Sequence, residues 1–153
     1  MTDCYCSSLA DLAVVPMGCE GLDEKVFLSL ETVREHGGKA WWLYLSKCRV
    51  CSQGWLVAQD DRIYDDFFMR RVSPAEAQGI IHGGSWPDDF MTYERVLSTG
   101  RRLSRPCEFL DPLDPSLIST AGDLRSERPD IAAEEIGYLL GLNSDEATRL
   151  VTA

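Results

Sequence analysis

The first half of the chain carries a hydrophobic pattern of helical period. Between residues 23 and 36 the apolar side chains fall three and four residues apart and would share one face of a helix: Val26, Phe27, Leu30 and Val33. Glycines at 37–38 follow, and glycine commonly ends a helix. The pattern predicts an amphipathic helix over residues 23–36.

The next three hydrophobic runs suit strands. They are rich in aromatic and β-branched residues and cover residues 39–47, 54–59 and 62–71. The turn Cys48-Arg49-Val50-Cys51 separates the first two runs, and Asp60-Asp61 separates the last two. This order predicts an antiparallel meander with two thiols at its first turn.

The second half of the chain predicts helices. Ser73 is a candidate N-cap, and the proline and Glu76 that follow it complete a capping-box sequence, which predicts the start of a helix. This helix is expected to end at the glycines 83–84. A second helix is expected over residues 87–98. Residues 101–121 contain three prolines and predict a loop or linker, and a helical pair is expected at about 130–140 and 144–151.

Charge narrows the classes of partner. The 153 residues carry a formal net charge of −10, which repels phosphate backbones and disfavours general binding of nucleic acid or anionic membranes. Such a charge suits a basic protein partner, and it also serves solubility alone. No apolar run approaches the ~18 residues of a membrane span. Asp3 and Asp11 argue against a signal peptide, so a cytoplasmic location is expected.

The six cysteines are the main candidates for chemistry. In a reducing compartment they suit metal ligands or buried thiols better than disulfides. Cys48 and Cys51 form a C-x2-C turn that points both sulfurs the same way, and three more thiols precede it: Cys4, Cys6 and Cys19. Cys107, beside Pro106, stands alone and is expected to be a small buried apolar residue.

The turn from Cys48 to Cys51, with its flanking strands, resembles a zinc-ribbon or zinc-knuckle module. The resemblance implies a structural zinc with four ligands, completed by two of Cys4, Cys6 and Cys19. Reduced thiols without metal, a redox dithiol and an iron–sulfur site remain alternatives. No helix follows the dithiol to favour redox chemistry, and no ligand-spaced histidine pair favours a catalytic zinc.

The expected fold class is α+β: a small antiparallel sheet with a zinc knuckle, packed helices and a C-terminal helical hairpin. Residues 1–100 are expected to form a zinc-stabilised α+β domain, residues 101–121 a loop or linker, and residues 122–153 the hairpin, packed on the same core.

The functional hypothesis is a non-enzymatic, zinc-stabilised module whose acidic surface binds a basic protein partner. A bacterial immunity or antitoxin-type inhibitor is one version, by analogy of charge and size. On a strand, Trp41 and Trp42 face opposite ways, so one can be presented. The candidate partner-binding residues are Trp42, Asp60, Asp61, Asp65 and Asp66.

Two other classes of function stay open. The first is a small hydrolase-like enzyme that uses His82, within a His-Gly-Gly segment, as general base. The second is a zinc-containing regulator that binds nucleic acid through a local basic patch formed by Arg101, Arg102 and Arg105.

Overall fold

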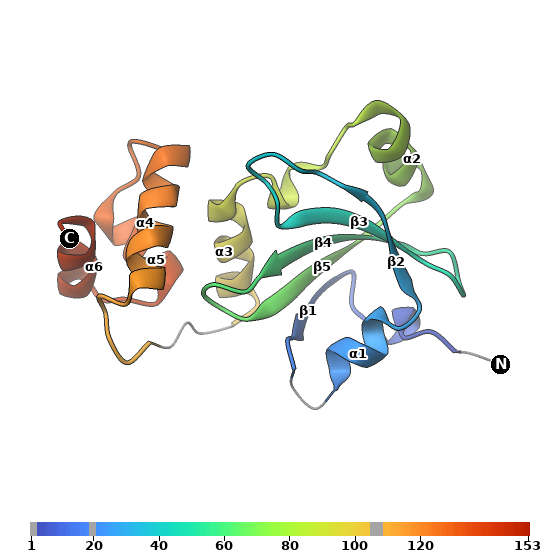
Figure 1. Ribbon diagram of the computed structural model, residues 1–153, viewed down its shortest axis with the longest axis horizontal. Helices are drawn as coiled ribbons and strands as arrows, with labels where there is room; N and C mark the ends of the chain where they lie inside the picture. The colour runs from blue at the N-terminus through green and yellow to red at the C-terminus, as the bar shows by residue number, and fades with distance from the viewer. Residues whose placement is uncertain (1–2, 19–20, 105–108) are drawn as a thin grey trace. The chain divides into compact units, whose positions relative to one another are not determined.

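The computed structural model describes residues 3–18, 21–104 and 109–153 (Figure 1). The chain divides into two compact units, one of Met1–Asp60 with Asp65–Met91 and the other of Asp61–Tyr64 with Thr92–Ala153. Within the described residues, the first unit holds a five-stranded antiparallel sheet and the second holds four α-helices. The α+β class predicted from the sequence is confirmed.

The sheet has the order β1-β5-β4-β3-β2, and each neighbouring pair is antiparallel. The predicted meander is present, with bounds moved by a few residues, as β3 (Leu43–Cys48), β4 (Gly54–Asp60) and β5 (Asp66–Val72). A strand that the hydrophobic pattern did not predict, β1 (Leu12–Pro16), pairs with β5 at one edge.

The helix predicted over residues 23–36 is wrong beyond its first turns. Helix α1 covers only Leu22–Phe27, and Leu30–Glu35 form the edge strand β2, which pairs with β3. A short isolated helix is marginal, whereas pairing with β3 gives these residues a ladder of backbone hydrogen bonds. The register of this pairing shifts between Thr32 and Arg34, and Val33, at the shift, is exposed.

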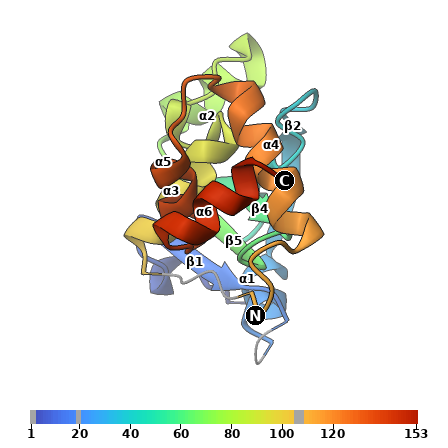
Figure 2. The same ribbon diagram turned by 90° about the vertical axis from the view of Figure 1, so that its left-hand side faces the viewer.

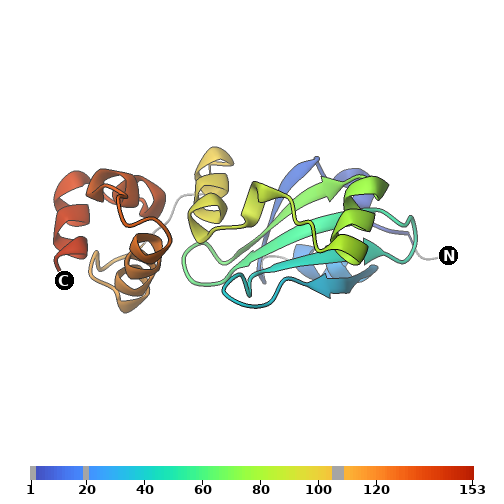
Figure 3. The same ribbon diagram turned by 90° about the horizontal axis from the view of Figure 1, so that it is seen from above.

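Side chains alternate between the two faces of the sheet. One face carries a buried cluster beneath α1 and the N-terminal segment, made of Cys6, Val15, Val26, Cys48, Trp55, Val57 and Met69. The other face lies toward α2 (Pro74–Gly83); Figures 1 and 3 show α2 on the side of the sheet opposite α1. The predicted capping box starts α2, with reciprocal hydrogen bonds between Ser73 and Glu76.

The second unit contains α3 (Tyr93–Arg102), α4 (Pro115–Glu127), α5 (Ala133–Leu140) and α6 (Ser144–Val151), which Figure 2 shows from the side where the C-terminus lies. The predicted helix over 87–98 instead begins at Tyr93, after a short 3-10 turn at Asp88–Phe90, and runs on to Arg102. The predicted C-terminal pair is present as α5 and α6.

The loop predicted over 101–121 is wrong at both ends. Helix α3 extends to Arg102, and α4 begins at Pro115, where Asp114 accepts the hydrogen bond of the Ser116 N–H as N-cap. The proline-rich composition suggested a linker, but proline is also favoured in the first turn of a helix. An aspartate immediately before Pro115 was the signal for a helix start.

Candidate metal centre

Four cysteines from two remote parts of the chain meet at one end of the sheet. The Sγ atoms of Cys4, Cys6, Cys48 and Cys51 all lie within 4.8 Å of one another. Tetrahedral zinc with Zn–S bonds of about 2.3 Å needs sulfurs about 3.8 Å apart, so small side-chain movements would satisfy the geometry. The cluster is compatible with a zinc-binding knuckle.

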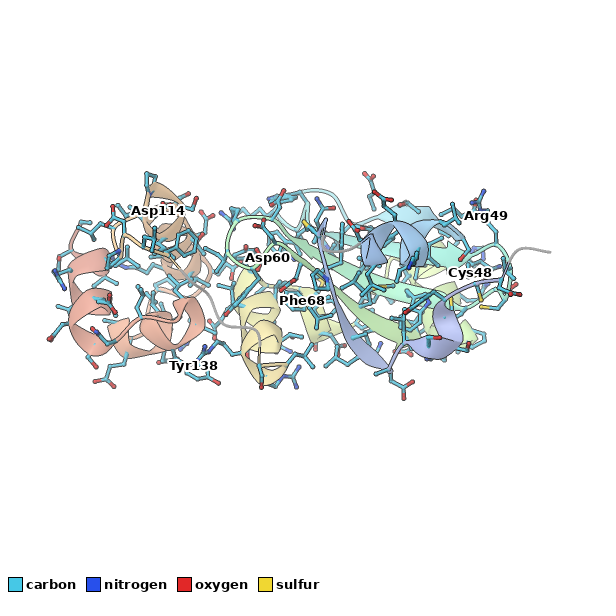
Figure 4. The ribbon with its side chains drawn as sticks, turned by 90° about the horizontal axis from the view of Figure 1, so that it is seen from below. Cys48, Arg49, Asp60, Phe68, Asp114 and Tyr138 are labelled. Carbon is cyan, nitrogen blue, oxygen red and sulfur yellow. The ribbon has the colours of Figure 1, made fainter. Side chains whose placement is uncertain are left out.

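The knuckle turn places its two thiols through local backbone geometry. Cys48 is the last residue of β3, and its N–H and carbonyl hold the turn through hydrogen bonds with Gln53 and Ser52. Ser52 adopts a positive φ of 67°, which reverses the chain before β4. The Arg49 N–H donates to the Ser29 carbonyl at 2.7 Å, which fastens the turn to the residues before β2. Figure 4 labels Cys48 and Arg49 at this end of the sheet, near the N-terminus.

The other two thiols come from the N-terminal segment. Cys6 opens a short 3-10 turn, Cys6–Ser8, and is buried in the core cluster. Cys4 lies two residues earlier and is half-buried. Tyr5, between them, has helical dihedral angles (φ −94°, ψ −3°), so a tight bend of the chain supplies two sulfurs to the cluster.

Hydrogen-bond donors surround the sulfurs. The indole N–H of Trp55 donates to Cys6 Sγ at 3.3 Å, and the backbone N–H of Val50 donates to Cys48 Sγ at 3.4 Å. The Cys48 thiol donates to the Ser29 hydroxyl at 3.3 Å, and the same hydroxyl can donate to the sulfur when Cys48 is a thiolate. Such donors stabilise negative charge on sulfur and orient it, as groups behind metal ligands do in metal sites.

The pKa of Cys48 is lowered to about 6. Burial raises this pKa, but the Ser29 hydroxyl and the backbone N–H groups of Cys51 and Val50 outweigh burial because they favour the thiolate. The surroundings of Cys48 therefore favour its thiolate form more than those of Cys4 and Cys6 do.

The neighbouring thiols shift the other way. Burial raises the pKa of Cys6 to about 12, and the Trp55 N–H offsets this only in part. The pKa of Cys4 is also raised: the backbone N–H of Cys6 lowers it, but the sulfurs of Cys51 and Cys48 and burial prevail. A thiolate repels negative charge on the neighbouring sulfurs, so the other thiols are harder to ionise. A divalent cation bound among the four sulfurs would neutralise this charge.

Arg71 joins the N-terminal segment to the knuckle. Its guanidinium donates to the carbonyl oxygens of Cys6 and Leu9 at 3.0 and 2.9 Å, and to Gln53 Oε1 at 3.2 Å. It also pairs with Asp11 at 3.0 Å. One side chain of β5 thus contacts the chain around both pairs of cysteines.

The remaining predicted site residues lie in different surroundings. Cys19 and Cys107 lie outside the described residues. Trp42 is only 5% exposed and its indole N–H donates to the Phe90 carbonyl at 2.9 Å, so the prediction that it is presented to a partner is wrong. The exposed member of the pair is Trp41, at 50%.

Each of the two predicted acidic pairs, Asp60-Asp61 and Asp65-Asp66, has one buried and one exposed member. Asp60 and Asp66 are fully buried and face each other in the register of β4 and β5, so they do not form part of an accessible surface. Asp61 and Asp65 are exposed, as the prediction requires. The buried members end β4 and begin β5, whereas the exposed members lie in the loop between these strands.

Among the residues of the two alternative hypotheses, His82 and Arg102 are exposed and Arg101 is half-buried. His82 is exposed in the last turn of α2, which ends at Gly84 in the left-handed conformation typical of a C-cap. Arg101 is placed over the ring of Tyr138 at 4.8 Å, Arg102 donates to Thr99, and Arg105 lies outside the described residues.

Ser29, Trp55 and Arg71 are functional candidates that the sequence did not reveal. Their roles depend on the pairing of remote strands, and only the position of Trp55, four residues after Cys51, gave a hint. Comparison of the chain with protein-family models, with characterised proteins and with solved structures finds no match. In the described part of the chain, none of the helices has both the length and the apolar content needed to cross a bilayer.

Proposed function

We propose that Cys4, Cys6, Cys48 and Cys51 bind one structural zinc ion and that the protein is a non-enzymatic interaction module built on this centre. The observation that carries the metal proposal is the convergence of four sulfurs within 4.8 Å. Four protein thiolates fill a tetrahedral zinc site and leave no position for water, which is typical of structural zinc.

The zinc would act as a cross-link. The N-terminal segment and the knuckle are separated by more than forty residues in sequence, and binding energy at such a site becomes folding energy. The ion would hold the N-terminal segment over the buried face of the sheet. Iron also accepts four thiolates in tetrahedral geometry, so metal analysis must distinguish the two.

Metal analysis of protein purified without added metal tests the site. We expect about one zinc per chain in the wild type, as one four-ligand site requires. Cys4→Ser, Cys6→Ser and Cys48→Ser should each reduce the zinc content, whereas Cys19→Ser should keep it. Full zinc in Cys4→Ser, or loss of zinc in Cys19→Ser, would show that the four-cysteine set is wrong.

Thermal unfolding separates a structural role from incidental binding. All four tryptophans lie in the sheet unit, at positions 41, 42, 55 and 86, so tryptophan fluorescence reports that unit. A chelator should lower the fluorescence transition of the sheet unit, because a structural metal contributes folding energy. An unchanged melting curve in protein shown to be metal-free would remove the structural role.

The proposed ligand of the module is a basic protein. Support comes from the net charge of −10 and from exposed carboxylates such as Asp61 and Asp65. An acidic surface accelerates encounter with a basic partner by electrostatic steering, and the bound module would block the partner sterically. An immunity or antitoxin-type inhibitor of a basic toxin is the concrete version of this proposal.

Affinity purification from native lysate tests the partner. A stoichiometric partner of basic pI should be retained at low salt and released as salt screens the charges. The double variant Asp61→Asn with Asp65→Asn should weaken retention, and Asp130→Asn with Asp145→Asn, which removes the same charge from two other exposed positions, serves as the matched control. Recovery of no stoichiometric basic protein would count against the proposal.

A further inference from the structure

The four sulfurs of the candidate metal centre differ in how well solvent reaches their residues. Cys6 and Cys48 are buried, Cys4 is half-buried, and Cys51 is exposed. Cys51 also lines a groove, together with residues of β3, β5 and α2, whose volume of about 380 Å³ is ample for a small molecule. A small reagent can therefore reach Cys51 from solvent while the sheet stays intact.

The sulfurs also differ in the groups that donate hydrogen bonds to them. Three accept a hydrogen bond from an N–H group, which belongs to Trp55 for Cys6, to Val50 for Cys48 and to the Cys6 backbone for Cys4. Within the described residues, no N–H or hydroxyl group donates to Cys51 Sγ. Donors that stabilise a thiolate also lower its nucleophilicity, so the Cys51 sulfur keeps the highest reactivity of the four.

Cys4 is the neighbour best placed to form a disulfide with Cys51. The four Sγ atoms lie within 4.8 Å of one another, and an S–S bond of about 2.05 Å needs a side-chain movement. Cys48 ends β3, and Cys6 opens a 3-10 turn within the buried cluster. Cys4 is half-buried and lies outside any helix or strand, so it is the freest of the three to move toward Cys51.

We propose that Cys51 is a modification site for hydroperoxides and that Cys4 completes the reaction as its disulfide partner. The Cys51 thiolate attacks one peroxide oxygen, the O–O bond breaks, and the sulfur becomes a sulfenic acid. The other oxygen takes a proton from solvent and leaves as water or an alcohol. The Cys4 thiolate then attacks the Cys51 sulfur, the S–S bond forms, and the S–O bond breaks. The departing hydroxide takes a proton and becomes water, and the peroxide has gained the two electrons that the two sulfurs lost.

The consequence of this reaction rests on the proposed zinc site. A disulfide between Cys4 and Cys51 removes two of the four thiolate ligands. The two that remain, Cys6 and Cys48, do not fill a tetrahedral site, so the zinc would be released. The disulfide would then replace the metal as the cross-link between the N-terminal segment and the knuckle. The centre would respond to hydroperoxide by losing zinc while the N-terminal segment stays attached.

Treatment of the zinc-loaded protein with hydrogen peroxide tests the site. The double variant Cys19→Ser with Cys107→Ser is the background, because the chain has six cysteines and only those of the centre then remain. Peroxide should release the zinc of this background, and a chromogenic chelator measures the release. Adding Cys51→His keeps a fourth zinc ligand and removes the reactive sulfur. This variant should retain its zinc under the treatment that empties the background.

Peptide mapping identifies the disulfide. Chymotrypsin cleaves after Tyr5, which lies between the two N-terminal cysteines, and trypsin cleaves after Arg49, which lies between the two cysteines of the knuckle. A double digest without reductant therefore separates all four cysteines of the centre. Mass spectrometry of the oxidised background should find the Cys4 peptide joined to the Cys51 peptide.

The outcomes separate the reactivity of Cys51 from the metal site itself. Background protein that contains no zinc after purification would overturn both. If zinc is present, three results would overturn the role of Cys51 alone: zinc retained in peroxide, a disulfide between other cysteines, or equal release from Cys51→His. If Cys51→His does not bind zinc, limited alkylation decides. Less than one equivalent of iodoacetamide should modify Cys51 first in the zinc-loaded background, and earlier modification of another cysteine would overturn the proposal.

Discussion

The guanidinium of Arg71 lies over the indole ring of Trp55, with its central carbon 4.4 Å from the ring centroid. The same indole donates its N–H to Cys6 Sγ, and the same guanidinium donates to the Cys6 carbonyl. Two neighbouring strands, β4 and β5, therefore hold Cys6 from both its side chain and its backbone. This pair links the order of the N-terminal segment to the geometry of the candidate metal centre.

Arg71→Met should destabilise the sheet unit strongly. The change removes charged hydrogen bonds to two carbonyl oxygens and to Gln53, and charged hydrogen bonds contribute about 1.5–3 kcal/mol. We expect the free energy of unfolding to fall by about 2–3 kcal/mol in urea titrations followed by tryptophan fluorescence.

Arg70→Met is the matched control for Arg71. The two arginine side chains are equally exposed, at 27%, but Arg70 points to the other face and pairs with Glu76 and Asp89. Such partly exposed ion pairs contribute about 1 kcal/mol or less. Equal losses in the two variants would contradict the anchoring role of Arg71.

Trp55→Phe should weaken metal binding more than it weakens the fold. The variant keeps an aromatic ring but loses the N–H that donates to Cys6 Sγ, and loss of a group behind a metal ligand lowers affinity about tenfold or more. Competition with a zinc chelator measures this effect. Trp42→Phe removes a buried indole N–H that donates to the Phe90 carbonyl instead, and it should leave zinc affinity unchanged.

The capping box of α2 should make stability depend on acid pH. The backbone N–H of Ser73 lowers the pKa of Glu76, against burial, and Arg70 lowers it further. A lowered pKa means that the folded state favours the carboxylate. The contribution is therefore present above the unfolded pKa of about 4.3 and is lost as pH falls through the folded pKa.

Glu76→Gln isolates that contribution. Near neutral pH the variant should be less stable than the wild type by about 0.5 kcal/mol, the low end for a cap, because the side chain is about a third exposed. The difference should shrink toward zero in acid, as thermal melts across the acid range can measure. If the stability difference between Glu76→Gln and the wild type stayed constant at all pH values, the predicted direction of the pH dependence would be wrong.

Gly137 and Gly122 should respond oppositely to alanine. A Cβ on Gly137 would lie 2.8 Å from Ala147 Cβ and 3.1 Å from the Leu142 carbonyl, where α5 and α6 cross closely. Gly137→Ala should therefore cost about 1–3 kcal/mol, as overpacking does. Gly122 lies inside α4 with open space around it, so Gly122→Ala should stabilise the helical unit by up to about 1 kcal/mol. Circular dichroism melts compare the two.

The sequence predicted a structural feature correctly where a few neighbouring residues decide it. Ser73 and Glu76 lie three apart and satisfy each other's backbone, so the start of α2 was predictable. The same kind of signal at Asp114-Pro115 was missed because the surrounding prolines favoured a linker. The helix prediction over residues 23–36 was wrong for another reason. The residues match a helix locally, but from Leu30 onward they pair with β3, beginning with Leu30 opposite Cys48, and form a strand.

The sequence by itself determined the α+β class, the cap of α2, the acidic charge and the C-x2-C turn, because each depends on composition or on residues within one turn of each other. Tertiary structure alone decided that Cys4 and Cys6 join Cys48 and Cys51, because spacing cannot say which remote segment crosses the end of β3. It also decided that Trp42, Asp60 and Asp66 are buried. Trp42 lies in the turn before β3, and Asp60 and Asp66 lie at strand ends, so only the packing of remote segments around them decides that they are covered.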